Sequence, residues 1–197
     1  MPIAKVIVLL GAGVVVQAGA VEIPPPVQAC VACHGASGEG TAQGPVLAGL
    51  STTYISAQIE NFIAGRRSNP VMSAIAQGYS DASLRNQVAA YFAGQGTTPK
   101  LLLRGQPIET TAAQQLYYQG DLVRDLPACY SCHGPSAVGG GPFPRLAGQQ
   151  PAYLKEQLLA WKNRQRSGDP DNLMGNIAMK LSADEIDALA GYLSGIR

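Results

Sequence analysis

The residues with the most distinctive chemistry are the four cysteines and two histidines, and all six fall into two copies of one motif. The first copy is Cys30-Val31-Ala32-Cys33-His34, and the second is Cys129-Tyr130-Ser131-Cys132-His133. Two thiols at this spacing lie one helical turn apart, so they can add to the two vinyl groups of one haem. The adjacent His then lies beneath the iron as its proximal ligand. The doubled motif therefore predicts two covalently bound haem c groups.

Three other uses of the four cysteines account for the six residues less completely. A structural zinc site would join pairs almost a hundred residues apart, and zinc gives no reason for a His directly after each pair. Redox disulfides of the thioredoxin type would need a βαβ context, which the sequence lacks. Structural disulfides suit an oxidising compartment but leave both His residues without a role. Haem attachment is the use that accounts for all six residues.

The two motifs belong to a longer internal repeat. The His residues are 99 positions apart, and the same offset relates Pro45 to Pro144. Further pairs at this offset are Leu47-Ala48-Gly49 with Leu146-Ala147-Gly148, Tyr54 with Tyr153, Gln58 with Gln157, Phe62 with Trp161, and Arg67 with Arg166. Three extra residues then change the offset to 102, which aligns Met72 with Met174. One unit of just under a hundred residues is thus duplicated, and this is not a solenoid of short repeats.

The repeat also indicates a second ligand for each iron. A Met opposite the His makes the iron six-coordinate and raises its reduction potential, which suits electron transfer. Met72 and Met174 occupy equivalent positions, whereas Met179 aligns with Gln77 and is expected to serve in packing. No spare His exists for a second His ligand at either site. The predicted axial ligands are His34, Met72, His133 and Met174.

Other residues of the repeat are candidates for contacts around the haems. A proximal His normally donates its second ring N–H to a carbonyl, and Pro45 and Pro144 each offer one eleven residues after their His. The alternative is that both prolines only punctuate a loop. Arg67 and Arg166 either pair with haem propionates or are solvated helix ends. Four aromatic residues are expected in the core, some of them along haem edges: Tyr54, Phe62, Tyr153 and Trp161.

Helices are the elements expected to position these residues, since no segment shows sustained alternation and the chain is predicted to be all-α. Each unit should contain a short helix with the Cys pair, a Gly/Pro-rich loop, a second helix (near 53–66 and 152–166), a loop holding the Met, and a final helix. Ser182 followed by Glu185 is a capping box that starts the last of these. A helix over 110–120 would open the second unit. The expected domains are residues 21–96 and 110–197, joined by a linker over 97–109.

The first twenty residues resemble an export signal. Lys5 precedes a short apolar stretch, and Ala18-Gly19-Ala20 supplies the small residues of a cleavage site after Ala20. The alternative is a membrane anchor, but the uncharged run from Val6 to Val21 is shorter than the roughly 20 residues of a spanning helix. Covalent haem attachment takes place outside the cytoplasm, so both features predict a periplasmic protein. The formal charge of +1 and the absence of a basic cluster argue against nucleic-acid binding.

With these residues in hand, the chain resembles the dihaem class I cytochromes c of the cytochrome c-four family. The resemblance rests on Ala-Cys-x-x-Cys-His-Gly in both halves, on 45–50 (Pro-Val-Leu-Ala-Gly-Leu) and 144–149 (Pro-Arg-Leu-Ala-Gly-Gln), and on the Met-x-x-Ile-Ala segments. It implies two tandem class I cytochrome c domains about a pseudo-twofold axis, with the haems close together. It also implies that the Pro45 and Pro144 carbonyls accept from the proximal His residues. Residues 77–80 depart from this pattern and are similar to the dihaem subunit of flavocytochrome c sulfide dehydrogenases.

Three functions are compatible with these features. The first is a periplasmic carrier, soluble or loosely attached to the membrane, that passes single electrons from a respiratory donor to a terminal oxidase or other acceptor. The second is an electron-relay subunit of an oxidoreductase, such as a flavocytochrome c sulfide dehydrogenase. The third is a haem enzyme or gas-binding protein, which would need an open iron site. No general base or nucleophile is visible, so we expect a carrier and no catalysis on a substrate.

Overall fold

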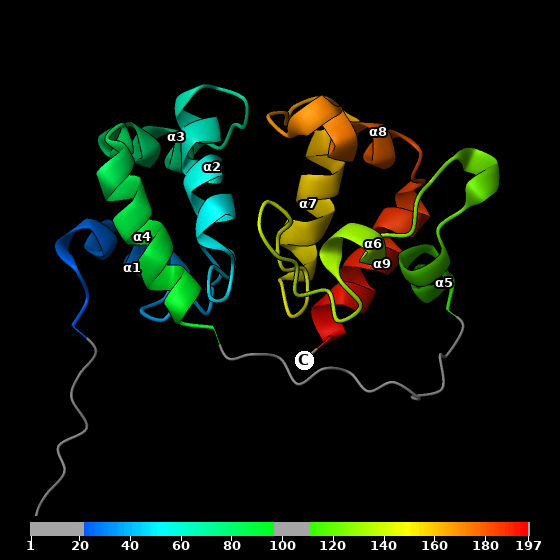
Figure 1. Cartoon of the computed structure of the whole chain (residues 1–197), viewed down its shortest axis with the longest axis horizontal. Coiled ribbons are helices and arrows are strands. Elements are labelled where there is room, and N and C mark those ends of the chain that lie inside the picture. The colour runs from blue at the N-terminus through cyan, green and yellow to red at the C-terminus, as the bar shows by residue number, and fades with distance from the viewer. Residues whose placement is uncertain (1–21, 97–110, 197) are drawn as a thin grey trace, which may run out of the picture.

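The structure, a computed structural model, describes residues 22–96 and 111–196, and these form two helical units side by side (Figure 1). The first unit contains η1 (Pro25–Val27), α1 (Gln28–His34), α2 (Thr52–Ile63), α3 (Pro70–Ala76), η2 (Gln77–Tyr79) and α4 (Ala82–Gly94). The second contains α5 (Ala112–Gln119), η3 (Leu122–Arg124), α6 (Tyr130–His133), α7 (Pro151–Lys162), η4 (Pro170–Asn172), α8 (Leu173–Met179) and α9 (Ala183–Gly195). The expected signal segment and linker lie outside the described residues.

Both units are all-α, as predicted. Within the described ranges the only β pairing consists of isolated bridges, one of which joins Arg67 of the first unit to Arg166 of the second. None of the helices found there is long and apolar enough to cross a membrane.

Each unit has its own hydrophobic core, and one cysteine of that unit, Cys30 or Cys129, packs against it. In the first unit α2 packs on α4 and buries Ile59 and Phe62 against Val88 and Phe92. In the second unit α9 packs against both α5 and α7. The buried side chains of this second core include Tyr117 of α5, Leu154 of α7, and Ile186 and Leu193 of α9. Burial of large apolar side chains at about 1.5–3 kcal/mol each gives both units a rigid frame.

The final helices begin where the sequence predicts. Asp81 caps α4 by accepting from Ser83 N. Ser182 caps α9 by accepting from Glu185 N, while the Glu185 carboxylate accepts from Ser182 N. The predicted capping box is therefore present. A second capping box, made by Thr111 and Gln114, begins α5.

Removing the α9 cap should weaken the second unit measurably. Ser182→Ala leaves the Glu185 amide without its acceptor, so we expect the free energy of unfolding to fall by about 1 kcal/mol. Chemical denaturation of the haem-loaded protein measures this change. Ser182→Asp, which keeps an accepting oxygen at the cap, should retain the stability. Equal losses in both variants would contradict the role of the cap.

Three local expectations were wrong. Both candidate Met ligands lie in short helices, α3 and α8, and not in loops. Asn69 caps α3, and Pro70 stands in its first turn. In α8, which follows η4 directly, Met174 N donates to Asp169. The helices α2 and α7 end at Ile63 and Lys162, earlier than expected, because the chain then turns through positive φ at Gly65 and Arg164. Finally, α6 is only four residues long and begins after Cys129.

Candidate haem sites and the wall between them

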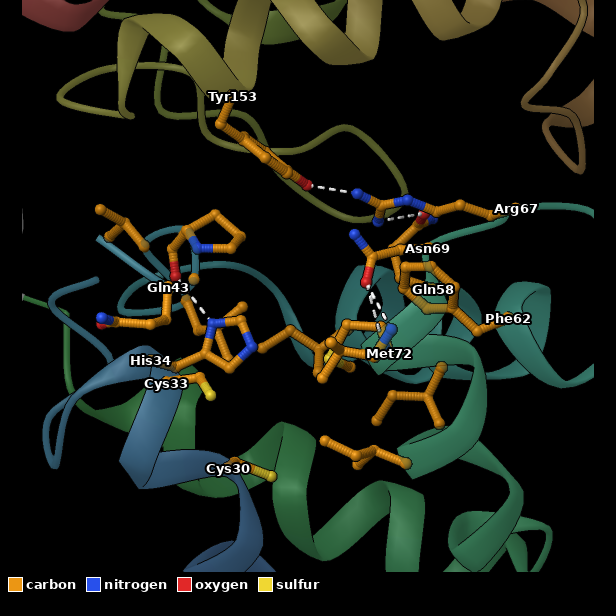
Figure 2. A pocket seen from close by; sticks show the side chains of 18 of the residues that line it. Cys30, Cys33, His34, Gln43, Gln58, Phe62, Arg67, Asn69, Met72 and Tyr153 are labelled. Atoms are coloured by element: carbon orange, nitrogen blue, oxygen red, sulfur yellow. Dashed lines mark hydrogen bonds between the residues drawn. The ribbon is translucent and has the colours of Figure 1, made fainter. Parts of the chain in front are cut away.

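The first candidate site is a cavity of about 350 Å³ that four predicted haem residues line: Cys30, Cys33, His34 and Met72. Helix α1 supplies the two Cys side chains and the His, and α3 supplies the Met from across the cavity (Figure 2). The C-x-x-C-H spacing produces this arrangement because α1 is helical from Gln28 through His34. His34 and Met72, almost forty residues apart in the sequence, thus line the same cavity.

The proximal His residues are held by backbone carbonyls. His34 Nδ1 lies 2.9 Å from the Pro45 oxygen, and His133 Nδ1 lies 2.9 Å from the Pro144 oxygen. Burial lowers the pKa of both imidazoles, although the carbonyl contact opposes this shift. A neutral imidazole that donates from Nδ1 keeps the Nε2 lone pair available for a metal.

The second candidate site is a cavity of about 450 Å³ lined by Cys132, His133, Pro144 and Met174. Cys129, the other predicted attachment residue, is half-buried with its Sγ 3.8 Å from the Leu116 oxygen. Met179 is outside the cavity, as predicted, but it is not a packing residue. Its side chain is 39% exposed and its sulfur lies near Arg164, because α8 turns this position toward solvent.

One wall separates the two cavities, and both units build it. The residues that line both cavities are Leu50, Tyr54, Gln58, Tyr153 and Gln157. Tyr54 and Gln58 come from α2, whereas Tyr153 and Gln157 come from α7 at the equivalent positions of the repeat. The aromatic residues Tyr54 and Tyr153 were expected in the core or along haem edges. Their place along both cavities agrees with this expectation, and each is shared between the two sites.

Arg67 and Arg166 cross this wall reciprocally. Arg67 Nη2 donates to the Tyr153 hydroxyl, and its Nη1 donates to Gln58 at 3.2 Å (Figure 2). Arg166 Nη2 donates to the Tyr54 hydroxyl at 2.9 Å and to Gln58 at 2.8 Å. The interpretation of these arginines as solvated helix ends is therefore wrong, since they are only 8% and 6% exposed.

Aromatic side chains complete the two arginine sites. The Arg67 guanidinium lies 4.6 Å from the Phe62 ring centroid, and that of Arg166 lies 4.7 Å from the Trp161 centroid. Such stacking favours a guanidinium over an ammonium group. Phe62 and Trp161 are buried as expected, and each forms the floor beneath its arginine.

Buried arginines normally have anionic partners, but within residues 22–96 and 111–196 neither of these forms a salt bridge with Asp or Glu. Arg166 Nε is also buried without a hydrogen-bond partner. A haem carries two propionate carboxylates, so a haem in each cavity would supply the missing negative charge. The residues present therefore fit haem in both charge and position.

The charge at the wall also affects the tyrosines. Burial raises the pKa of Tyr54, but the guanidiniums of Arg166 and Arg67 outweigh burial and lower this pKa below its usual value. Burial in turn lowers the pKa of Arg67, and the oxygens of Tyr153 and Tyr54 raise it beyond the usual value. Arg67 therefore remains cationic at any physiological pH.

Two glutamines at the interface had no sequence prediction. Gln149 Oε1 accepts from Val46 N at 3.0 Å, and its Nε2 donates to Val46 O at 2.9 Å, directly beside Pro45. Gln150 Nε2 donates to the Thr41 oxygen at 2.7 Å. The repeat held a signal for Gln149, since the first copy has the apolar Leu50 at that position.

The alternative uses of the cysteines find no support. All four lie in the described ranges, and none is in a disulfide. In the same part of the chain, no cluster of three or more His, Cys, Asp or Glu side chains could hold a metal ion by itself.

Comparison with known proteins identifies the class. The family model for cytochrome c matches residues 27–99 and again residues 111–197. The fold and the paired cavities thus define a dihaem cytochrome c, an electron-transfer protein with two covalently bound haem c groups.

Individual relatives make the assignment more specific. The crystal structure of reduced cytochrome c4 from Pseudomonas stutzeri has a TM-score of 0.75 and 33% identity, covering 87% of this chain and 95% of that one. A protein from Thiomonas intermedia described as a thiosulfate dehydrogenase electron acceptor is 41% identical, over 87% of this chain and 80% of its own length. A thiosulfate dehydrogenase from Marichromatium purpuratum has a TM-score of 0.73 and 42% identity, covering 84% of this chain but only 36% of that one. The chain belongs to the dihaem cytochrome c4 family.

Proposed function

We propose that this protein accepts electrons from a thiosulfate dehydrogenase in the periplasm and passes them to a terminal oxidase or another respiratory acceptor. The observation that carries this proposal is the pair of Cys/His/Met cavities with a shared wall. The donor class comes from the relatives. The thiosulfate dehydrogenase electron acceptor and the thiosulfate dehydrogenase structure share 41% and 42% identity with the chain, against 33% for the cytochrome c4 structure.

In this proposal each cavity holds one haem in a closed ligand set. Cys30 and Cys33 attach the first haem, and Cys129 and Cys132 attach the second. The iron ligands are His34 with Met72 and His133 with Met174. A haem held by these residues would supply one-electron oxidation and reduction. The chain's own residues keep both ligands in place through the change of oxidation state, because Pro45 and Pro144 fix the imidazoles and α3 and α8 fix the methionines.

The shared wall supports electron movement between the haems. Tyr54 and Tyr153 line both cavities, so protein atoms fill the space between the sites. The hydrogen bonds of Arg67 and Arg166 hold these side chains in one arrangement. A rigid, packed path needs little reorganisation when an electron crosses. Because a dehydrogenase removes electrons in pairs, a carrier with two adjacent sites can accept one pair in a single encounter.

Export completes the proposal. Cleavage after Ala20 would release the mature chain into the compartment where haem c is attached. The measured mass of the mature protein should therefore correspond to a chain that begins at Val21. A retained N-terminus would instead indicate a membrane anchor.

Reduction by a defined donor tests the proposed function. Haem-loaded protein mixed with thiosulfate and a catalytic amount of a thiosulfate dehydrogenase should become fully reduced, with two electrons taken up per chain. Thiosulfate alone should reduce it far more slowly. Failure of the dehydrogenase to accelerate reduction would contradict the proposed donor. A flavoprotein that co-purifies with the chain from native cells in a fixed ratio would favour the flavocytochrome alternative.

A further inference from the structure

The two units differ at one charged position beside the candidate Met ligands. Asn69 and Asp169 each stand immediately before a Pro, and each lines the cavity of its own unit. Asn69 Oδ1 accepts from Met72 N at 3.0 Å (Figure 2). Asp169 Oδ2 accepts from Met174 N at 2.6 Å. The backbone contact is thus the same in both units, but only the second unit has a carboxyl group there.

Capping alone does not explain the carboxyl group of Asp169. Its second oxygen, Oδ1, is buried without a hydrogen-bond partner, and no described Lys or Arg forms a salt bridge with it. Arg166 is three residues away, but its terminal nitrogens bind Tyr54, Gln58 and Gln157. Leaving a charge buried and unpaired destabilises a fold. The Asn in the first unit makes the same contact without that cost.

We propose that Asp169 tunes the second haem by lowering its reduction potential below the value that an Asn at this position would give. The inference rests on the His/Met haems of the proposed function. Oxidised iron carries one more positive charge than reduced iron, so a negative charge in the cavity wall stabilises the oxidised form. The charge acts strongly because the buried oxygen is poorly screened by solvent and salt. The neutral Asn69 has no such effect, so the charge shifts electrons toward the first haem.

A pair of reciprocal substitutions tests this inference by spectroelectrochemical titration at neutral pH. Asp169→Asn keeps the oxygen that accepts from Met174 N and removes only the charge. We expect the reduction potential of one of the two one-electron steps to rise by about 59 mV, which is a tenfold change in its equilibrium constant. The potential of the other step should not change. Asn69→Asp should move the other step downward by a similar factor. Asp171→Asn is the matched control, because Asp171 is exposed and carries the same formal charge two residues away.

The outcomes separate this inference from the proposed function. Unchanged steps in Asp169→Asn, or equal shifts in Asp169→Asn and Asp171→Asn, would overturn the tuning role while leaving a low-spin dihaem protein intact. A wild-type spectrum without two six-coordinate haems would instead overturn the proposed ligation. The melting temperature of each variant, measured alongside, shows whether the cap has survived the exchange.

Discussion

Replacing Met174 by Ala is expected to convert the second haem from a low-spin six-coordinate centre to a high-spin five-coordinate one, leaving the first haem unchanged. Met174 lines the cavity that also contains His133, and its helix is fixed by the contact from its backbone N to Asp169. Alanine removes the thioether and offers no replacement ligand. We expect half of the thioether-to-iron absorbance to disappear and the reduced protein to bind one carbon monoxide per chain. The potential of that haem should fall by roughly 100 mV, a fraction of the ~0.8 V that axial ligands span.

The matched control for this experiment is Met179→Ala. Met179 is five residues further along α8, at the end of the same helix, but its side chain faces solvent and Arg164. Its removal should leave both the spectrum and the potentials as they are. If Met179→Ala abolished the thioether signal and Met174→Ala preserved it, the assignment of ligands from the repeat would be wrong. Met72→Ala should produce the corresponding change in the first haem.

Replacing Arg166 by Leu is expected to uncouple the two units. The guanidinium makes hydrogen bonds to Tyr54, Gln58 and Gln157 and stacks on Trp161. Two of these four partners belong to the other unit. Hydrogen bonds to a charged group contribute about 1.5–3 kcal/mol each before losses elsewhere, so a net destabilisation of about 3 kcal/mol is expected. Leucine also leaves buried hydroxyl and amide groups without partners.

Calorimetry of the haem-loaded protein measures this effect. The wild type should unfold in one cooperative transition, whereas Arg166→Leu should show two, because each unit has its own core. Arg166→Lys keeps the charge but loses the planar fork, so we expect an intermediate loss. The control is Arg164→Gln, since Arg164 is exposed and two residues away. A single unshifted transition in Arg166→Leu would show that the wall does not couple the units.

The predictions that succeeded depend on local pattern and on the repeat. Covalent haem chemistry restricts the two Cys and the His to neighbouring positions, so the motif is complete in five residues. The capping box of Ser182 and Glu185 is likewise local. Met72 and Met174 could be chosen over Met179 because duplication aligned them, and the structure places both in the same cavities as their His residues. Their role as ligands stays a prediction that the Met174 experiment tests.

Besides the local errors in helix bounds and at Met179, the failed prediction concerns contacts between the units. Arg67 and Arg166 follow a helix end in a polar segment, and nothing in that neighbourhood indicates that they are buried. Their partners Tyr153 and Tyr54 lie 86 and 112 residues away in the chain, and only tertiary structure brings them together. The uncompensated oxygen of Asp169 is similarly invisible in sequence, because it depends on which neighbours are absent. The expected domain limits at 97–109 fall outside the described residues and remain a prediction.

The reciprocal contacts of Arg67 with Tyr153 and of Arg166 with Tyr54 have the pattern of an isologous interface, in which one patch meets its own copy across a twofold axis. The molecule is therefore arranged as a homodimer whose two subunits have become one polypeptide. Joining the subunits sets their local concentration in the millimolar range, whatever the abundance of the protein. Pairing of the two redox centres then no longer depends on dilution, and each copy is free to diverge, as Asn69 and Asp169 have done.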